Sequence, residues 1–231
     1  MTTKYDSVLK KVLNEINPSD DEVKLINKET KKFVAEFRKL LKSKKINAEV
    51  FVGGSYAKDT MVKKGVYDID VFVRFDKSYD DDELSDLTEG LLKDKWVYKV
   101  VHGSRNYFQI NINEVLFLEV VPVRKISKPD EAVNTTDLSY RHVKWINKNV
   151  KTKKILNDIK IAKAFAHGCD CYGAESYISG FSGYALELLV YHYKGFLNFL
   201  KAVNRMKDKV FIDIEKYYKN KNELLIEINA A

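Results

Sequence analysis

Apolar residues recur at every third or fourth position in the first part of the chain, which is the spacing of an amphipathic helix. The first such stripe covers residues 4–16, and Pro18 then interrupts it. Ser19, followed three residues later by Glu22, matches a capping box. We therefore predict one helix over residues 4–16 and a second from residue 19 to about residue 41.

The spacing then changes to that of β-strands. In residues 67–75, Ile69 and Val71 alternate with Asp68 and Asp70, so the apolar and acidic side chains should face opposite sides of a sheet. An acidic run at residues 80–83 suits the N-terminus of a further helix better than a metal site. Strands are predicted for residues 48–52, 67–75, 96–101, 106–112 and 115–121.

A helical period returns at Ser139 and continues to about Ala202, and residues 210–214 then look like a new strand. This order predicts an α+β fold, in which a mixed sheet with flanking helices is followed by a helical domain. We expect a catalytic domain over residues 1–135 and a helical domain over 136–205. Residues 206–231 would begin a further domain or form a C-terminal extension.

Composition and charge agree with a globular protein that has a polyanionic partner. Of the 231 residues, 45% are apolar and 32% are charged, which is ordinary for a soluble domain. The formal net charge of +7, with a pI of about 9.1, favours a partner such as nucleic acid. The basic residues are dispersed along the chain, so this support is mild.

The sequence also indicates where the protein should reside. The N-terminus lacks the apolar core of a signal peptide, and the apolar run at residues 184–200 contains Glu187 and His192, which favours a buried helix over a membrane span. Cys169 and Cys171 are too close in sequence for an unstrained disulfide and too few for a zinc site. We expect a soluble, cytoplasmic protein with reduced cysteines and no membrane partner.

Three acidic residues form a candidate metal site. Asp68 and Asp70 lie two residues apart on one strand, so their carboxylates should project from the same face and can hold hard divalent cations. Glu119 lies in an otherwise apolar strand, where an unpaired acid is costly to bury. A metal would offset that cost. Three carboxylates on neighbouring strands are what two-metal phosphoryl transfer requires.

A glycine-serine turn precedes these acids and suits the same chemistry. Gly53 and Gly54 would let the backbone approach a triphosphate, and a short helix beginning near Ser55 would offer N–H donors to phosphate oxygens. Lys58, one turn later, can supply a positive charge. Either motif alone is more often a simple turn or a solvated strand edge. Together, with an acid in a later strand, they favour a functional site.

These motifs resemble a known family. Residues 52–60 followed by residues 68–73 resemble the nucleotidyltransferase superfamily typified by DNA polymerase β, and more closely the archaeal-type, class I CCA-adding enzymes (tRNA nucleotidyltransferases). The similarity spans roughly residues 50–200. Agreement extends to residues 102–107, 119–122, 172–175, 180–184 and 187–189.

The resemblance implies roles for individual residues. Asp68, Asp70 and Glu119 match the catalytic, metal-binding carboxylates, with Mg²⁺ as the implied cofactor, and Glu119 stands where the family more often has Asp. Lys58 falls where many members have Arg, and the segment before His142 departs from the family pattern. The implied contacts of the nucleoside triphosphate (NTP) are Gly54, Ser55, Lys58, His142, Lys163 and Tyr172.

Each NTP contact has an ordinary alternative. His142 could be a packing residue, Lys163 a solvated lysine, and Tyr172 a residue that closes a turn. For the glycines at 180 and 183 we favour a packing role, in which a helix start fits closely against the sheet.

The implied reaction is CCA addition: transfer of CMP and AMP from CTP and ATP to the 3′ end of tRNA, with release of pyrophosphate. Members of this family are as a class longer than 231 residues and carry further domains that grip the tRNA. One alternative is an oligonucleotide or second-messenger synthetase of the same superfamily, which would need only nucleotides. Another is a non-catalytic RNA-binding module with a relic active site.

Overall fold

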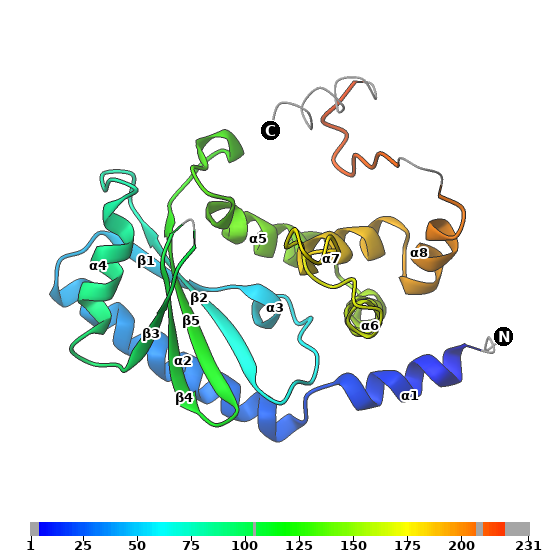
Figure 1. Cartoon of the computed structure of the whole chain (residues 1–231), viewed down its shortest axis with the longest axis horizontal. Helices are drawn as coiled ribbons and strands as arrows, with labels where there is room; N and C mark the ends of the chain where they lie inside the picture. The colour runs from blue at the N-terminus through cyan, green and yellow to red at the C-terminus, as the bar shows by residue number, and fades with distance from the viewer. Residues whose placement is uncertain (1–4, 104, 207–209, 220–231) are drawn as a thin grey trace.

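The computed structural model describes residues 5–103, 105–206 and 210–219. They form the expected α+β fold, in which a five-stranded mixed sheet with flanking helices is followed by a block of helices (Figure 1). Within the described residues, no helix is both long and apolar enough to cross a membrane.

The N-terminal helices and the sheet take up the first half of the chain. The Ser19 side chain accepts from the Glu22 N–H at 3.2 Å and Glu22 accepts from the Ser19 N–H at 2.7 Å, so the predicted capping box is confirmed. The elements are α1 (Asp6–Ile16), α2 (Asp20–Ser43), β1 (Ala48–Val52), α3 (Gly54–Ala57), β2 (Tyr67–Phe75), α4 (Glu83–Leu92), β3 (Tyr98–Val101), β4 (Tyr107–Asn113) and β5 (Leu116–Arg124).

Helices make up more than half of the described residues after β5. Two short 3₁₀ helices, Pro129–Glu131 and Thr135–Leu138, lead into α5 (Ser139–Asn149), α6 (Lys153–Gly168), α7 (Gly183–His192) and α8 (Phe196–Val203). The long helical period is broken at residues 169–182, where Tyr172 and Phe181 form an isolated parallel β-bridge.

The sheet has the strand order β1-β2-β5-β4-β3, and only β2 and β5 run parallel among its neighbouring pairs. Asp70 on β2 lies opposite Glu119 on β5, and Glu119 lies opposite Gln109 on β4. Side chains that are directly opposite share a face of the sheet. Three neighbouring strands therefore present polar groups side by side.

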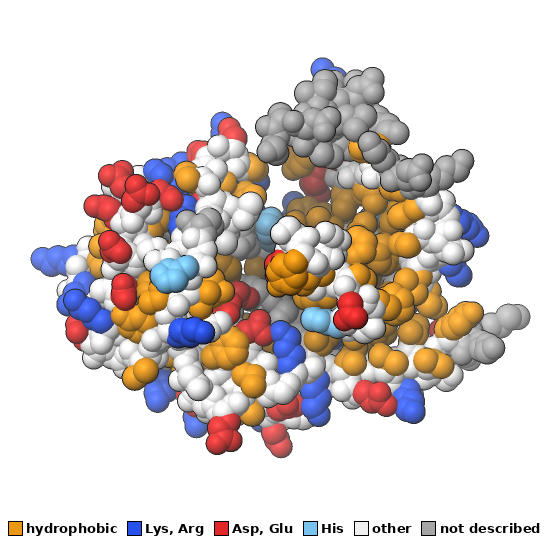
Figure 2. All heavy atoms as spheres, in the orientation of Figure 1, with side chains coloured by type: hydrophobic (Ala, Val, Ile, Leu, Met, Phe, Trp, Pro, Cys, Tyr) orange, Lys and Arg blue, Asp and Glu red, His pale blue; other side chains and the backbone are white. Residues whose placement is uncertain are grey.

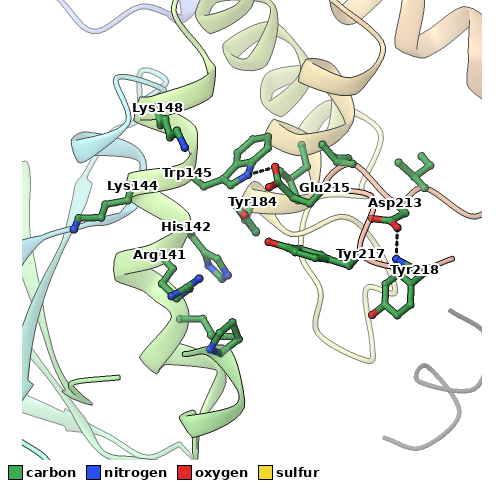
Figure 3. Close-up of a pocket in the computed structure, with 15 residues that line it drawn as sticks. Arg141, His142, Lys144, Trp145, Lys148, Tyr184, Asp213, Glu215, Tyr217 and Tyr218 are labelled. Carbon is green, nitrogen blue, oxygen red and sulfur yellow. Dashed lines mark hydrogen bonds between the residues drawn. The ribbon is translucent and has the colours of Figure 1, made fainter. Parts of the chain in front are cut away.

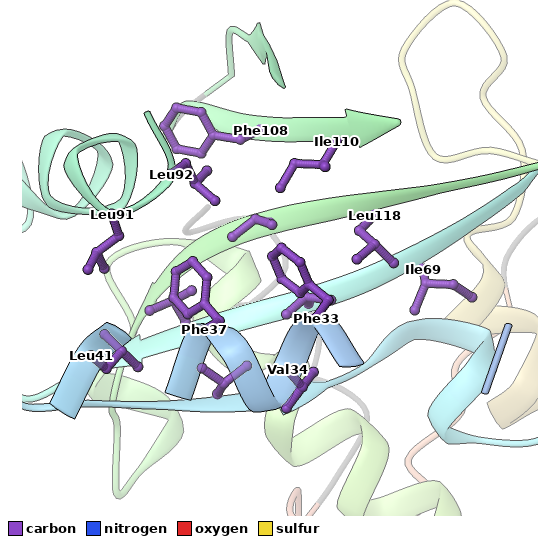
Figure 4. Packing of buried hydrophobic residues seen from close by; sticks show 14 of the residues in the cluster. Phe33, Val34, Phe37, Leu41, Ile69, Leu91, Leu92, Phe108, Ile110 and Leu118 are labelled. Atoms are coloured by element: carbon purple, nitrogen blue, oxygen red, sulfur yellow. The ribbon is translucent and has the colours of Figure 1, made fainter. Parts of the chain in front are cut away.

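The other face of the sheet is the main hydrophobic core. Phe33 and Phe37 from α2, and Leu91 and Leu92 from α4, pack against strand residues such as Leu118 (Figure 4). All five are at most 3% exposed. Burial of each such side chain contributes about 1.5–3 kcal/mol. This core holds the sheet rigid from one side, and the opposite face of the sheet stays free for polar residues.

A second core lies among the helices of the C-terminal half, where Ile146, Ile159 and Leu186 are almost completely buried. Helix α1 joins this core, because Leu9 and Leu13 pack against it. The chain therefore begins on the helical block and then crosses to α2, which lies against the sheet (Figure 1).

One predicted strand is wrong. Residues 210–214 carry no β-structure, and the segment instead contacts the helical block, with the Trp145 Nε1–H donating to Glu215 at 2.7 Å. A strand needs an edge to pair with, and the described sheet does not pair with this segment. The rest of the expected C-terminal extension, residues 220–231, lies outside the described residues.

Candidate active site

The three acidic residues predicted as metal ligands lie on the face of the sheet opposite the main core. Asp70 and Glu119 are cross-strand neighbours, and Asp68 is two residues before Asp70 on the same strand. Gln109 Nε2 donates to Glu119 Oε1 at 2.8 Å. The alternation seen in the sequence thus places all three carboxylates on one surface.

Two of the carboxylates, Asp70 and Glu119, have raised pKa values. Burial, followed by the charges of Glu119 and Asp68, raises the pKa of Asp70 from 3.8 to about 6. Burial and the nearby Asp68 also raise the pKa of Glu119, although the hydrogen bond from Gln109 opposes this. Crowded carboxylates with raised pKa values are groups that a cation would stabilise in the ionised form.

The donor set fits a divalent cation, but the side chains are held by other partners. Lys64 Nζ lies 2.5 Å from Asp68 Oδ1, and Gln109 binds Glu119. Among the described residues, no three Asp, Glu, His or Cys side chains already converge as metal ligands. Asp70 and Glu119 lie on neighbouring strands, which are about 4.8 Å apart in a sheet.

The glycine turn comes directly before α3 and packs against Asp70. Gly54 has a φ of +59°, and a Cβ there would lie 1.8 Å from Asp70 Oδ2. The Gly53 N–H donates to the Asp70 backbone oxygen at 2.8 Å. Only glycine suits position 54, both for its backbone conformation and for the closeness of the carboxylate. Ser55 follows on α3.

Lys58 and Lys163, predicted as separate triphosphate contacts, are brought together by Glu187. Lys58 Nζ lies 2.7 Å from Glu187 Oε2, and Lys163 Nζ lies 2.7 Å from Glu187 Oε1. The hydroxyl of Thr60 donates to Glu187 Oε1 at 2.9 Å. Glu187 and Thr60 are completely buried, and the two lysines are 8% and 3% exposed. We name these four residues the lysine–glutamate cluster.

Sequence reasoning missed the part that Glu187 plays. It used this residue to argue against a membrane span and as part of the family resemblance, and gave it no role in the site. A carboxylate in a strongly apolar helix is itself a sign of a buried charge partner. The partners could not be predicted, because Lys58 lies 129 positions before Glu187.

His142 is brought into the site by stacking. Its ring lies over Tyr184 with 3.9 Å between the ring centres and 18° between the planes. Burial and the charge of Lys58 lower the pKa of His142 to about 4, despite the opposing charge of Glu187. The imidazole is therefore neutral near pH 7. Such a ring can donate one hydrogen bond but carries no positive charge.

Tyr172 stacks on His167 with 3.9 Å between ring centres. Burial, followed by the charge of Glu187, raises its pKa to about 12. A Cβ at Gly183 would lie 2.6 Å from the Tyr172 hydroxyl and 3.8 Å from Lys163 Cε, so both groups lie beside the start of α7. Tyr172 and Lys163 are thus brought together, and their contact with a triphosphate stays a prediction.

The packing role expected for the glycines at 180 and 183 involves different neighbours. A Cβ at Gly180 would lie 2.3 Å from the backbone oxygen of Cys171, and Gly183 contacts Tyr172. These glycines pack against the segment that follows α6, not against the sheet. The expectation of a contact with the sheet was wrong.

A pocket of about 570 Å³ adjoins the stacked His142 and Tyr184. Figure 3 shows that α5 contributes Trp145 and a row of cationic side chains, and that the segment with Tyr217 and Tyr218 closes the opposite side. The cationic residues are Arg141, Lys144 and Lys148. Aromatic rings beside cations can stack on nucleobases and bind phosphates.

The acidic run at residues 80–83 has a structural use. Arg105 is 8% exposed and makes ion pairs with Asp81 and with the fully buried Asp137. Asp137 Oδ1 also accepts from the backbone N–H of Arg124 at 2.7 Å. This network ties the end of β5 to the segment before α5, and α5 is the helix that carries His142.

In Figure 2, acidic, basic and histidine side chains gather in the hollow between the sheet and the helical block.

Two family models match this chain, one after the other. Residues 1–155 match the Second Messenger Oligonucleotide or Dinucleotide Synthetase domain, and residues 157–229 match the second domain of tRNA nucleotidyltransferase.

Curated relatives carry the name CCA-adding enzyme. The protein from Nanoarchaeum equitans is 49% identical over 181 residues, which are 78% of this chain and 45% of that protein. The one from Methanocaldococcus jannaschii is 30% identical over 224 residues, or 93% of this chain and 49% of that protein. The chain spans about half the length of these relatives.

Solved structures share the fold at low sequence identity. An E. coli CdnC structure with ATP has a TM-score of 0.71 at 15% identity and covers 96% of this chain and 78% of its own. The Cid1 poly(U) polymerase has a TM-score of 0.62 at 17% identity and covers 84% of this chain and 56% of its own. The chain therefore belongs to the polymerase-β-like nucleotidyltransferase superfamily, and the archaeal CCA-adding enzymes are its homologues.

Proposed function

We propose that this chain is the catalytic part of a metal-dependent nucleotidyltransferase that adds CMP and AMP, from CTP and ATP, to the 3′ end of tRNA. The observation that carries the proposal is the arrangement of Asp68, Asp70 and Glu119 on one face of the sheet, in a chain 49% identical over 181 residues to a CCA-adding enzyme.

In the proposed reaction, the 3′-hydroxyl oxygen of the RNA bonds to the α-phosphorus of the nucleotide. The bond from that phosphorus to the oxygen bridging to the β-phosphate breaks, pyrophosphate leaves with its electron pair, and the hydroxyl proton passes to solvent. Asp68, Asp70 and Glu119 would hold Mg²⁺, which when bound lowers the pKa of the hydroxyl and offsets charge at phosphorus.

The other residues would bind and orient the triphosphate. Lys58 and Lys163 offer N–H donors with positive charge, and the backbone at Gly54 and Ser55 can lie close to phosphate oxygens. Tyr172, which burial keeps protonated, and the neutral His142 would each donate one uncharged hydrogen bond. In this proposal the face of the sheet binds metal, and residues from both halves of the chain bind the triphosphate.

The test is incubation of the protein with tRNA lacking its 3′ CCA, Mg²⁺ and one labelled nucleotide at a time. We expect label from CTP, and then from ATP, to enter the tRNA, with pyrophosphate released in equal amount. Replacing Mg²⁺ by excess chelator should abolish transfer. Absence of incorporation from either nucleotide under all conditions would contradict the proposal.

A second candidate is synthesis of an oligonucleotide or cyclic second messenger from nucleotides alone. The match of residues 1–155 to the synthetase domain favours it. The same incubation without tRNA distinguishes the two, because a synthetase forms free short products. A purely RNA-binding role would instead leave function intact in Asp70→Asn. A cytoplasmic location, where tRNA is processed, stays a prediction.

A further inference from the structure

The lysine–glutamate cluster joins both halves of the molecule at the candidate triphosphate site. Lys58 and Thr60 come from the segment after α3, whereas Lys163 lies on α6 and Glu187 on α7. All four residues are at most 8% exposed. The buried cluster contains two positive groups and only one negative group. Because an unpaired buried charge is costly, the excess positive charge has to be explained.

The charges of the cluster do not balance. Two ammonium groups face one carboxylate, so the cluster carries a net charge of about +1 when all groups are ionised. Both oxygens of Glu187 already accept hydrogen bonds, Oε1 from Lys163 and Thr60 and Oε2 from Lys58. A further anion would therefore have to bind the lysines directly.

The lysines retain donors for such an anion. Each ammonium has three N–H groups. In the described contacts, Lys163 donates to Glu187 and Thr60, and Lys58 donates to Glu187. That leaves one donor on Lys163 and two on Lys58. A polyphosphate tail has the charge and the acceptors to match them.

We propose that Glu187 is a positioning residue that holds Lys58 and Lys163 in place and keeps Lys163 charged, so that their remaining N–H groups bind the triphosphate. The proposal rests on the proposed nucleotidyltransferase site. It assigns Glu187 no contact with the nucleotide. Its effect passes through the two lysines.

The electrostatic part of this role comes from the groups that surround Lys163. Burial and the charge of Lys58 lower the pKa of Lys163, and the charge of Glu187 is the main influence that raises it. Without this carboxylate, Lys163 should lose its proton more readily as the pH rises. The other titratable groups around the cluster are Lys64, Asp70, His142, Tyr172 and Tyr184.

The experiment compares the wild-type protein with Glu187→Gln, which keeps the shape of the side chain but removes its charge. Binding of tripolyphosphate, ATP and CTP is measured by calorimetry from pH 6 to pH 9, and folding is checked by circular dichroism. We expect the variant to bind tripolyphosphate about tenfold or more weakly at pH 8, equivalent to the loss of one charge-assisted contact. The ligand itself titrates in this range, so the two proteins are compared at each pH, and the ratio of the variant's affinity to that of the wild type should fall further with rising pH.

Two further variants make the result decisive. Thr60→Val keeps the charges but removes one hydrogen bond to each of Glu187 and Lys163, so affinity should fall about fivefold at every pH. Glu83→Gln makes the same charge change on the exposed start of α4 and should bind as the wild type does. If Glu187→Gln does not fold, the Thr60→Val result decides.

Wild-type affinity at every pH in folded Glu187→Gln, or unchanged affinity in Thr60→Val, would overturn the proposal. The proposed function fails separately. If the wild type binds tripolyphosphate but transfers no nucleotide to RNA, CCA addition is excluded. The pH-dependent loss in Glu187→Gln would still support the role of Glu187.

Discussion

The side chain of Asp70 lies between the glycine turn and the acidic residue of the neighbouring strand. Its carboxylate packs against Gly54 of the glycine turn and lies beside Glu119 of the adjacent strand. Burial and the neighbouring acids raise its pKa to about 6. The ionised form is therefore less stable in the folded protein than in water, until a cation joins it.

Asp70→Asn should abolish transfer and yet stabilise the metal-free protein at neutral pH. The folded protein binds the Asp70 proton more tightly than the unfolded chain does, so ionisation costs stability as the pH rises from about 4 to about 6. We expect a gain on the order of 1–3 kcal/mol at pH 7–8 and almost none near pH 4. Urea unfolding at several pH values measures this gain. A loss of stability at pH 7 would contradict it.

Gly54→Ala should disrupt the turn. A Cβ at this position would meet Asp70 Oδ2 at 1.8 Å, and the backbone φ of +59° is unfavourable for alanine. We expect a loss of about 2–4 kcal/mol in the free energy of unfolding, together with loss of activity.

Gly90→Ala is the matched control for this substitution. Gly90 lies in α4, with nothing within 4 Å of its Cβ position. This variant should be stabilised by up to about 1 kcal/mol. Equal effects of the two substitutions would show that the close approach at Gly54 is unimportant.

Sequence patterns predicted the positions of side chains well where these depend only on nearby residues in the same strand or helix. The alternation in β2 was enough to place Asp68 and Asp70 on one face, because a strand fixes that relation by itself. The partners of Glu187 and the stacking of His142 on Tyr184 depend on how helices pack, and no local pattern encodes this. The roles assigned to the site residues stay predictions until the variants are measured.

Among the elements, the start of α7 shows how a helix terminus positions a distant side chain. Ser182 caps the helix by accepting from the N–H of Ala185, and Gly183 leaves room for the Tyr172 hydroxyl. Tyr172 lies eleven positions earlier in the chain, in the segment that follows α6. The glycine therefore determines where this hydroxyl lies.

Gly183→Ala should displace Tyr172, because the new Cβ would lie 2.6 Å from its hydroxyl oxygen. We expect a loss of about 1–3 kcal/mol in stability and a raised KM for the nucleotide. Adding Tyr172→Phe removes the oxygen and leaves the nearest ring carbon at 3.6 Å, an ordinary contact. The double variant should recover the stability but not the KM. Absence of such recovery in a double-mutant cycle would refute the contact.

Helices and strands with a clear periodic pattern of apolar residues were predicted closely. A strand that needs another segment to pair with was not. Helix α2 and strand β2 were confirmed nearly to the residue, because a capping box and a strict alternation define them. The strand predicted at residues 210–214 was wrong. Its apolar residues pack onto the helical block, and Ile212 and Ile214 line the pocket beside His142.

At the scale of the whole molecule, α1 links the two cores. Its apolar side chains pack with those of the helical block, although more than a hundred residues separate them in sequence. The backbone N–H of Lys63 donates to the oxygen of Ile16 at 2.6 Å, and Lys160 reaches Asn17 at 3.3 Å. The junction between α1 and α2 is thus fastened to both halves.

Leu13→Ala should weaken the helical block selectively. The side chain is partly buried against that core, so we expect a loss of about 1–3 kcal/mol. Hydrogen exchange should show reduced protection of the backbone N–H groups of α6, with those of β2 and β5 nearly unchanged. Val8→Ala, at a side chain that is 57% exposed, is the control and should change little. Uniform loss of protection across the sheet would contradict the assignment.

The position of α1 also affects what happens when this polypeptide is cut into two fragments. A cut in the connection between β5 and α5 would leave the N-terminal fragment carrying a helix whose apolar stripe has lost its partner, and the C-terminal fragment with a gap in its interior. Each piece would expose apolar surface to water, and the two surfaces are complementary. Fragments made by such a cut should therefore be poorly soluble apart and reassemble when they are mixed.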